Sequence, residues 1–399
     1  MNILIKNARL VDKEIDGLLD LYIEDGKIKE VGEGLDYDCQ TLDAEGLVVM
    51  PAFTDLHVHF RDPGFTHKED LETGSRAALR GGYTFVTLMG NTNPISSNME
   101  VVDYVLDKAR DLDLIDVHQV VSLTEKFDGR SLGHLDSIDR NKVRVLSEDG
   151  HGVISNKVTY DAMVWAKERD FIIMTHAEDM ELTPIDYRIS ENIISLRDLY
   201  LASVTGVHLH LSHVSTKEAI EAIRIFKARG TRVSCEVAPH HIALADLDYR
   251  VNPPIRQRED NLEIIRGIQD GTVDAIATDH APHTAKDKEN GAPGMVGLET
   301  AFSICYSELV EKGHIGLQKL TELMSTNPSR IMGLNKGRIK EGYQADLVIV
   351  DLDKEYTIDA SSFASKGRNT PFDGRNYKGQ VVATIRKGLI KYKNEEYPI

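Results

Sequence analysis

Residues 47–64 of the chain read LVVMPAFTDLHVHFRDPG, and this stretch guides the interpretation of the rest. Its apolar first part, residues 47–53, predicts a buried strand. Beyond it, His57, His59 and Arg61 alternate with other residues, and side chains two apart on a strand point the same way. Two imidazoles and a guanidinium would therefore project together from one strand end, before a Pro-Gly pair turns the chain. Taken alone, the stretch also fits a surface strand with incidental histidines.

The composition of the 399-residue chain is that of an ordinary soluble globular protein, with 41% hydrophobic and 28% charged residues. No run approaches the roughly 18 apolar residues of a membrane span, and the N-terminus lacks the features of a signal peptide. Three scattered cysteines argue against disulfides and thiolate metal sites and predict a cytoplasmic location. The net charge of −17 disfavours nucleic acid and anionic membranes as partners, but it permits a small anionic substrate.

Strand and helix patterns in the sequence divide the chain into three segments. Residues 1–50 show short strand patterns and a hairpin signal at Asp25-Gly26, and residues 336–399 return to strand patterns. Between them, in residues 51–335, eight apolar runs alternate with helical patterns such as that of residues 216–229. This order predicts an α/β fold: a (β/α)₈ TIM barrel with a small β-sandwich formed from both chain ends. An open doubly wound sheet is the alternative, but no glycine-rich phosphate loop follows any strand.

The predicted barrel strands are the run before His57 and residues 84–89, 116–121, 142–146, 171–174, 207–211, 232–237 and 273–277. Chemistry in such a barrel sits where strands end and loops begin. Five of these ends carry imidazole or carboxylate groups: His57 and His59, the pair Glu148-Asp149, His176, His213, and Asp279. A single histidine after a strand is more often an ordinary loop residue, but this coincidence predicts a metal site.

The number of candidate ligands exceeds the tetrahedral complement of one zinc ion. With one carboxylate from the pair Glu148-Asp149 there are six candidate ligands, and the sequence therefore predicts two zinc ions that share a bridging carboxylate. Two cations would also lower the pKa of a shared water toward neutrality. Asp279 could bind a metal and also accept a proton as water attacks.

Four motifs resemble the class I dihydroorotases of the amidohydrolase superfamily: DLHVHFRDPG at 55–64, SHVST at 212–216, VNPPIR at 251–256 and TDHAPH at 278–283. The likeness extends over almost the whole chain and includes QADL at 344–347 and NTPFDG at 369–374. As a set these motifs are highly specific, whereas His-x-His alone would indicate only the superfamily.

The resemblance implies reversible, zinc-dependent cyclisation of N-carbamoyl-L-aspartate to dihydroorotate, the third step of pyrimidine synthesis. The metal ligands implied are His57, His59, Asp149, His176, His213 and Asp279, with Asp149 as the bridge where many relatives use a carboxylated lysine. Asp279 is the implied acid/base, and the implied substrate contacts are Arg61, Asn91, Asn252, His283 and the backbone of Pro293 and Gly294. Arg61 would hold the substrate carboxylate. A homodimer, and an association with aspartate transcarbamoylase, are further expectations.

The sequence departs from the family pattern without losing a ligand. Residues 89–92 read MGNT where the family usually has proline before the asparagine, and the bridging pair is Glu-Asp rather than Asp-Asp. The chain between His176 and His213 is shorter than expected, as are the loops before Asn252 and after His283.

Two other interpretations stay open. One is a hydantoinase or allantoinase, although these relatives typically have lysine where Asp149 stands and lack Arg61 in this motif. The other is a non-catalytic barrel homologue, although such proteins usually lose metal ligands.

Overall fold

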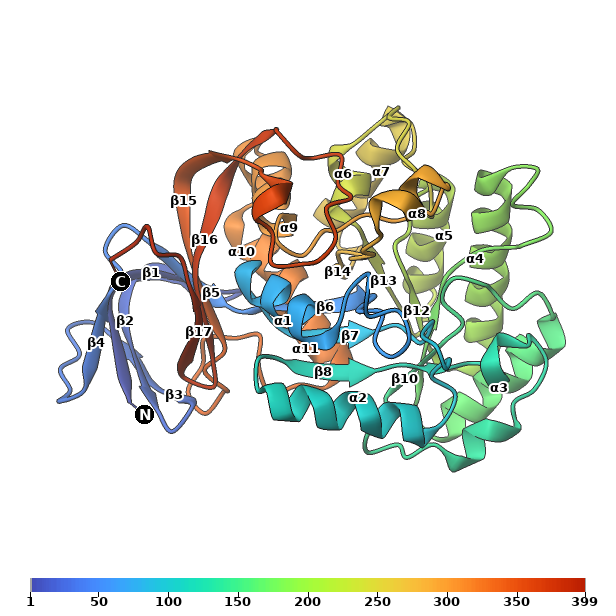
Figure 1. Ribbon diagram of the computed structural model, residues 1–399, viewed down its shortest axis with the longest axis horizontal. Coiled ribbons are helices and arrows are strands. Elements are labelled where there is room, and N and C mark those ends of the chain that lie inside the picture. Colours follow the sequence, from blue (N-terminus) through green and yellow to red (C-terminus); the bar gives the residue numbers. More distant parts are fainter. Residues whose placement is uncertain (1, 399) are drawn as a thin grey trace.

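Parallel strands form a closed barrel in the computed structural model, which describes residues 2–398 (Figure 1). In order these strands are β6 (Phe53–Val58), β7 (Tyr83–Leu88), β8 (Asp116–Gln119) continued by β9 (Val121–Ser122), β10 (Val145–Ser147), β11 (Ile172–Thr175), β12 (His208–Leu211), β13 (Val233–Val237) and β14 (Ala275–Ile276). A parallel bridge between Val58 and His280 closes the ring from β14 to β6. The predicted (β/α)₈ barrel is confirmed.

Two of the predicted strands are shorter than expected, because their first residues bond elsewhere. The backbone amides of Lys142 and Val143 donate to the carbonyl of Asp139 in a turn, so β10 begins only at Val145. The amide of Val273 donates to Gly267, in the preceding helix, so β14 is reduced to two residues.

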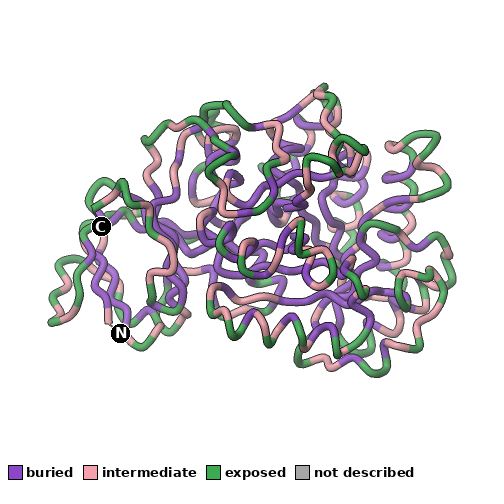
Figure 2. The backbone as a smooth tube through the Cα atoms, viewed as in Figure 1, coloured by how far each residue is buried: buried purple, intermediate pink, exposed green. Residues whose placement is uncertain are grey.

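Helices surround the barrel and cover its apolar outer face (Figures 1 and 2). They are α1 (Leu71–Arg80), α2 (Met99–Leu112), α3 (Asn156–Glu168), α4 (Tyr187–Thr205), α5 (Lys217–Ala228), α6 (Pro239–Ala243), α7 (Arg258–Asp270), α8 (Ala285–Glu289), α9 (Ala301–Cys305), α10 (Leu317–Thr321) and α11 (Asn327–Met332). Polar side chains accept hydrogen bonds from the first-turn amides of the helices α1 to α5. None of the helices within residues 2–398 is both long and apolar enough to cross a membrane.

Strands from both chain ends make one eight-stranded sheet beside the barrel. They are β1 (Ile3–Val11), β2 (Asp16–Glu24), β3 (Lys27–Gly32), β4 (Gln40–Asp43), β5 (Val48–Pro51), β15 (Leu347–Thr357), β16 (Asn376–Arg386) and β17 (Leu389–Lys393). The sheet curls on itself, because Ile3, Ile23 and Ile385 share one buried core. The predicted sandwich of both ends is therefore confirmed, while its exact boundaries at residues 50 and 335 stay a prediction.

The predicted hairpin at Asp25-Gly26 joins β2 to β3. Both turn residues have a positive φ, 49° and 76°, as the favoured two-residue hairpin turn requires. Only Ala52 separates β5 from β6, so the terminal sheet leads directly into the first barrel strand.

Candidate active site

A cavity of about 230 Å³ lies at the carboxyl ends of the barrel strands. Its lining includes all but one of the site residues predicted from the sequence: His59, Arg61, Asn91, Asp149, His176, His213, Asn252, Asp279, His283, Pro293 and Gly294. His57, the remaining one, is fully buried and contacts the same carboxylates, at distances given below. The structure thus brings the predicted residues together from distant parts of the chain.

Three of the four clustered imidazoles have an oxygen acceptor on the nitrogen that faces away from the cluster. The outer Nδ1 of His57 lies 3.2 Å from Glu236 Oε1, and the outer Nδ1 of His59 lies 2.9 Å from Asn91 Oδ1. The outer Nε2 of His176 lies 2.7 Å from Glu178 Oε2. An acceptor at the outer nitrogen holds the proton there, so the inner nitrogen presents a lone pair.

The inner nitrogens surround the Asp149 carboxylate. Its oxygens lie 3.2 Å from His57 Nε2, 3.5 Å from His59 Nε2 and His176 Nδ1, and 3.7 Å from His213 Nε2. Asp279 Oδ1 lies 3.2 Å from His59 Nε2 and 3.7 Å from His57 Nε2. Lone pairs and carboxylates packed at these distances repel one another unless a cation lies between them.

The donor set fits zinc. Tetrahedral zinc with bonds of about 2.0–2.1 Å places its ligand atoms about 3.3 Å apart, within the observed spread of spacings. His57 Nε2 is buried without a hydrogen-bond partner among the described residues, as expected for a metal ligand. Two overlapping groups of ligand atoms lie within 4.8 Å of one another, one of His57, His59 and Asp279 and one of His57, Asp149 and His213. His176 Nδ1 lies 2.9 Å from His213 Nε2, at the edge of the second group.

The two candidates for the bridging carboxylate face in different directions. Asp149 faces the imidazoles, whereas Glu148 Oε2 accepts a hydrogen bond of 2.8 Å from the amide of Thr124. Glu148 also accepts from the Thr124 hydroxyl, and its burial raises its pKa to about 7. The geometry therefore favours Asp149 as the metal ligand.

Asp55 fixes the position of Asp279 relative to His57. The fully buried carboxylate of Asp55 accepts hydrogen bonds from the amides of His57, at 3.0 Å, and Thr278, at 3.1 Å. Burial raises the pKa of Asp55 to about 7 despite these bonds. Asp55 thus joins the ends of β6 and β14 and takes no part in the imidazole cluster.

The only cationic side chain that lines the cavity within the described residues is Arg61. Its Nη2 lies 3.2 Å from His283 Nε2. Burial and the neighbouring guanidinium lower the pKa of His283 to about 3, so the imidazole is neutral and accepts a hydrogen bond from Arg61. A guanidinium in this position can bind a substrate carboxylate.

Asn369 ties the C-terminal segment to the cavity wall. Its Oδ1 accepts from the amide of His283 at 3.0 Å, and its Nδ2 donates to the carbonyls of Ala281 and Gly294. Gly294 has a φ of +129°, and a Cβ there would lie 2.8 Å from the Cβ of Ala281. Glycine is required for this close approach.

The two asparagines that were predicted to bind substrate also contact the protein. Asn91 accepts from His59, as described above, and Asn252 Nδ2 donates to Glu178 Oε2 at 2.9 Å. Their amides lie in the cavity lining, so a role toward substrate stays a prediction beside this orienting role.

Three further histidines at the strand ends lie outside the cavity lining. His280 Nδ1 accepts from the amide of Gly297 at 3.1 Å, and His241 Nε2 lies 3.0 Å from the carbonyl of Pro253. His240 is buried beside His241. These three side chains support loops, which is the commoner use of a buried histidine.

The sequence analysis missed Glu178, Glu236 and Asn369. An acidic residue inside the apolar strand that ends at Val237 was the available signal for Glu236. Glu178 follows the metal-site histidine by two residues, and Asn369 opens the NTPFDG motif.

Replacing Glu236 by glutamine is expected to weaken zinc binding about 10- to 100-fold. Burial would raise the pKa of Glu236, but hydrogen bonds from His210 and His57 hold it at about 2, so an ionised carboxylate orients His57. Competition with a chromophoric chelator measures the affinity. Glu191→Gln is the matched control, because this buried glutamate bonds Arg256 at 2.9 Å and contacts none of the clustered imidazoles. Equal zinc affinities in the two variants would contradict the role of Glu236.

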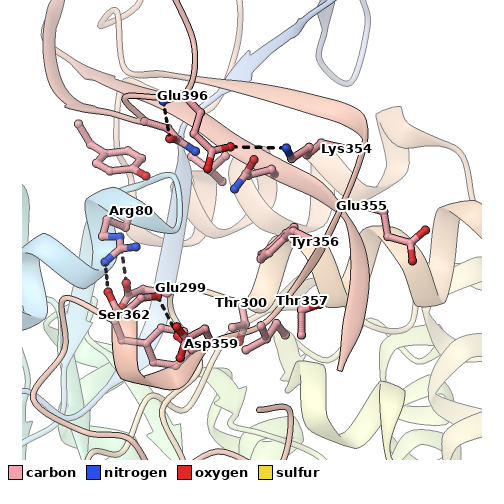
Figure 3. A pocket seen from close by; sticks show the side chains of 16 residues that line it. Arg80, Glu299, Thr300, Lys354, Glu355, Tyr356, Thr357, Asp359, Ser362 and Glu396 are labelled. Atoms are coloured by element: carbon pink, nitrogen blue, oxygen red, sulfur yellow. Dashed lines mark hydrogen bonds and ion pairs between the residues drawn. The ribbon is translucent and has the colours of Figure 1, made fainter. Parts of the chain in front are cut away.

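A larger cavity, of about 460 Å³, lies between the terminal sheet and the barrel (Figure 3). Its cations are paired within the protein: Arg80 lies 3.2 Å from Glu299, and Lys354 lies 3.5 Å from Glu396. None of the predicted site residues lines it.

Comparison with known sequences identifies the family of the chain. The sequence model of the amidohydrolase family matches residues 48–391. The dihydroorotase of Clostridium botulinum (strain Eklund 17B / Type B) is 53% identical over 397 residues, which cover 98% of this chain and 100% of that protein. The dihydroorotase of Geobacter metallireducens is 37% identical, with 98% of this chain and 100% of that protein covered.

Solved structures share the fold. The L-hydantoinase (dihydropyrimidinase) of Arthrobacter aurescens superposes with a TM-score of 0.90 at 26% identity, covering 97% of this chain and 95% of that one. Dihydropyrimidinase of Brevibacillus agri gives a TM-score of 0.91 at 22% identity, with 100% and 96% covered, which shows the fold alone. The chain therefore belongs to the amidohydrolase family and, within it, to the dihydroorotases.

Proposed function

We propose that this enzyme is a dihydroorotase, which catalyses the reversible, zinc-dependent cyclisation of N-carbamoyl-L-aspartate to (S)-dihydroorotate and water, the third step of de novo pyrimidine synthesis. The observation that carries the proposal is the placing of Arg61 in one cavity with a cluster of four imidazoles and two carboxylates. The cluster suits hydrolysis of an amide, and the guanidinium suits a substrate that bears a carboxylate. The 53% identical dihydroorotase supports the same reaction.

The amidohydrolase family is metal-dependent, and we propose two zinc ions per chain. His57, His59 and Asp279 would hold one, His176 and His213 the other, and Asp149 would bridge them. When bound, the two ions polarise the amide carbonyl and acidify a water molecule. The convergent lone pairs described above support this assignment.

Side chains of the protein carry out the proton transfers of the reaction. In the hydrolytic direction the Asp279 carboxylate takes the proton of the attacking water and returns it to the ring nitrogen as the amide C–N bond breaks. In the cyclising direction it takes a proton from the terminal ureido nitrogen as that nitrogen attacks the carbon of the protonated side-chain carboxyl group, and it returns the proton to the hydroxyl group that leaves as water. The hydrogen bonds of Asp55 to the amides of His57 and Thr278 keep the segment that carries Asp279 beside the end of β6.

The other lining residues of the cavity would orient the substrate. Arg61 would bind the carboxylate that stays outside the reacting bond, with His283 beside it. Asn91, Asn252 and the backbone at Pro293 and Gly294 would contact the ring. This arrangement selects an acidic cyclic amide over a neutral one.

The direct test is incubation of the purified, zinc-loaded protein with N-carbamoyl-L-aspartate. Dihydroorotate should accumulate, and the protein should contain about two zinc ions per chain. A protein with no turnover and no bound metal would instead support the non-catalytic interpretation.

Replacing Arg61 by methionine is expected to raise KM for dihydroorotate about 10- to 150-fold, with a smaller change in kcat. The side chain supplies one charge-assisted contact of about 1.5–3 kcal/mol, which binds ground state and transition state alike. Steady-state kinetics of Arg61→Met and of the charge-conserving Arg61→Lys separate the loss of charge from the loss of volume. An unchanged KM in Arg61→Met would show that the substrate carboxylate binds elsewhere.

We propose a cytoplasmic enzyme, supported by the three free cysteines, of which Cys235 and Cys305 are buried. Association with aspartate transcarbamoylase stays a prediction that copurification of the two enzymes would test.

A further inference from the structure

Two neighbouring barrel strands, β12 and β13, carry polar side chains on the face that points into the barrel. Leu209 and Leu211 of β12, and Cys235 and Val237 of β13, belong to the apolar core under the helices. Because side chains alternate along a strand, the residues that alternate with these four face the barrel interior. They are His208, His210, Ser234 and Glu236. Branched apolar residues usually fill such an interior, so a polar layer there needs a physical reason.

Hydrogen bonds join these side chains to His57, and we call the five residues the β12–β13 network. His208 Nε2 lies 3.0 Å from Ser234 Oγ, which lies 2.8 Å from His210 Nδ1. His210 Nε2 lies 3.0 Å from Glu236 Oε2, and Glu236 Oε1 lies 3.2 Å from His57 Nδ1. All of these side chains except His208 are buried. The network therefore runs through the barrel core from the start of β12 to the imidazole cluster.

The carboxylate of Glu236 sets the direction of each hydrogen bond in the network. Ionised Glu236 can only accept, so both neighbouring imidazoles must turn an N–H toward it, His57 from Nδ1 and His210 from Nε2. With its single proton on Nε2, His210 accepts at Nδ1 from the Ser234 hydroxyl. Ser234 Oγ then accepts from Nε2 of His208. One proton on each imidazole is enough to satisfy every contact.

The far end of the network agrees with this direction. Burial, together with neighbouring imidazole and guanidinium groups, lowers the pKa of His208 to about 3, so its ring is neutral and carries one proton. With that proton on Nε2, Nδ1 is a bare lone pair, and His208 Nδ1 has no hydrogen-bond partner among the described residues. A lone pair is also the form that the nearby guanidinium groups of Arg144 and Arg232 favour.

We infer that His210 is a positioning residue for the metal site, which it serves by holding the Glu236 carboxylate against His57. The inference rests on the proposed zinc ion at His57. Without the His210 donor, Glu236 Oε2 would have no hydrogen bond among the described residues, and the carboxylate could turn away from His57. The proton would then no longer be held on His57 Nδ1, and Nε2 would lose the fixed lone pair that a metal requires.

NMR of the full-length protein with ¹⁵N-labelled histidine side chains tests the direction of the network. His210 should carry its proton on Nε2 and show the shift of an unprotonated nitrogen at Nδ1, with and without zinc. The resonances that disappear in His210→Gln identify the residue. A proton on Nδ1 of His210, alone or together with one on Nε2, would overturn the inference. The result does not depend on turnover or on bound zinc, so it stands apart from the proposed function.

Two substitutions of His210 separate its contact with Glu236 from its contact with Ser234. A glutamine amide nitrogen can take the place of Nε2, whereas an asparagine amide nitrogen takes the place of Nδ1. His210→Asn should therefore bind zinc about 10- to 100-fold more weakly than wild type, and His210→Gln within about threefold of it. Competition with a chromophoric chelator measures the affinities, and circular dichroism shows whether each variant is folded.

His118→Asn is the matched control, because His118 is another buried barrel imidazole, on β8. Its Nε2 accepts from the amide of Arg144 at 2.8 Å, and it contacts none of the clustered imidazoles. The control should bind zinc as the wild type does. Equal zinc affinities in folded His210→Asn and His210→Gln would overturn the positioning role. A wild type that binds no zinc would refute the proposed metal site instead, while the NMR result would still decide the hydrogen-bond direction.

Discussion

Replacing Asp279 by alanine is expected to lower kcat for dihydroorotate hydrolysis by about 10³- to 10⁴-fold while much of the zinc remains bound. Loss of a positioned proton acceptor alone accounts for about 10²–10⁴-fold. The metal is retained because His57, His59 and Asp149 still present their lone pairs to it. Single-turnover kinetics and zinc analysis of the same preparation measure the two effects together.

Asp246→Ala is the matched control for Asp279→Ala. Both aspartates have a left-handed backbone, with φ of 55° and 50°, but Asp246 lies outside the cavity lining. The control therefore removes the same side chain from the same kind of backbone. A wild-type kcat in Asp279→Ala would refute the acid/base role. If Asp279→Ala lost all of its zinc together with its activity, the loss of activity would be explained by the role of Asp279 as a metal ligand alone.

Replacing Asp149 by alanine is expected to remove most of the bound zinc and to lower kcat by at least about 10⁴-fold. Its carboxylate lies within 3.7 Å of an inner nitrogen of each of the four clustered imidazoles. Without it, both metal positions lose a charged ligand and no group bridges them. Zinc per chain after gel filtration is the measurement, with kcat determined on the same material.

Glu148→Ala decides between the two candidates for the bridging carboxylate. This variant should lose stability, because Glu148 is buried and bonded to Thr124, but it should keep its zinc. Zinc loss in Glu148→Ala together with retention in Asp149→Ala would reverse the assignment.

The sequence predicted the barrel because its apolar runs and helical patterns alternate, which is a local property. It did not predict where β10 and β14 begin, since that depends on the partners of the Lys142 and Val273 amides. The boundaries of a strand are set by hydrogen bonds to distant or neighbouring backbone, and these leave little trace in residue type.

In the candidate site, too, some residues were predictable from the local sequence and others were not. Strand ends converge in a barrel, so His57, His59, His176, His213 and Asp279 could be grouped from position alone. The orienting groups could not, because Glu236 lies 179 residues from His57 and only the folded barrel places them in contact.

Arg61 and the imidazole cluster together should make this chain an enzyme for an acidic cyclic amide. The decisive measurement is kcat/KM of the zinc-loaded protein for dihydroorotate, hydantoin and allantoin. Dihydroorotate should be preferred by at least about 10-fold, because one charge-assisted contact contributes about 1.5–3 kcal/mol. Faster turnover of hydantoin or allantoin than of dihydroorotate would contradict it.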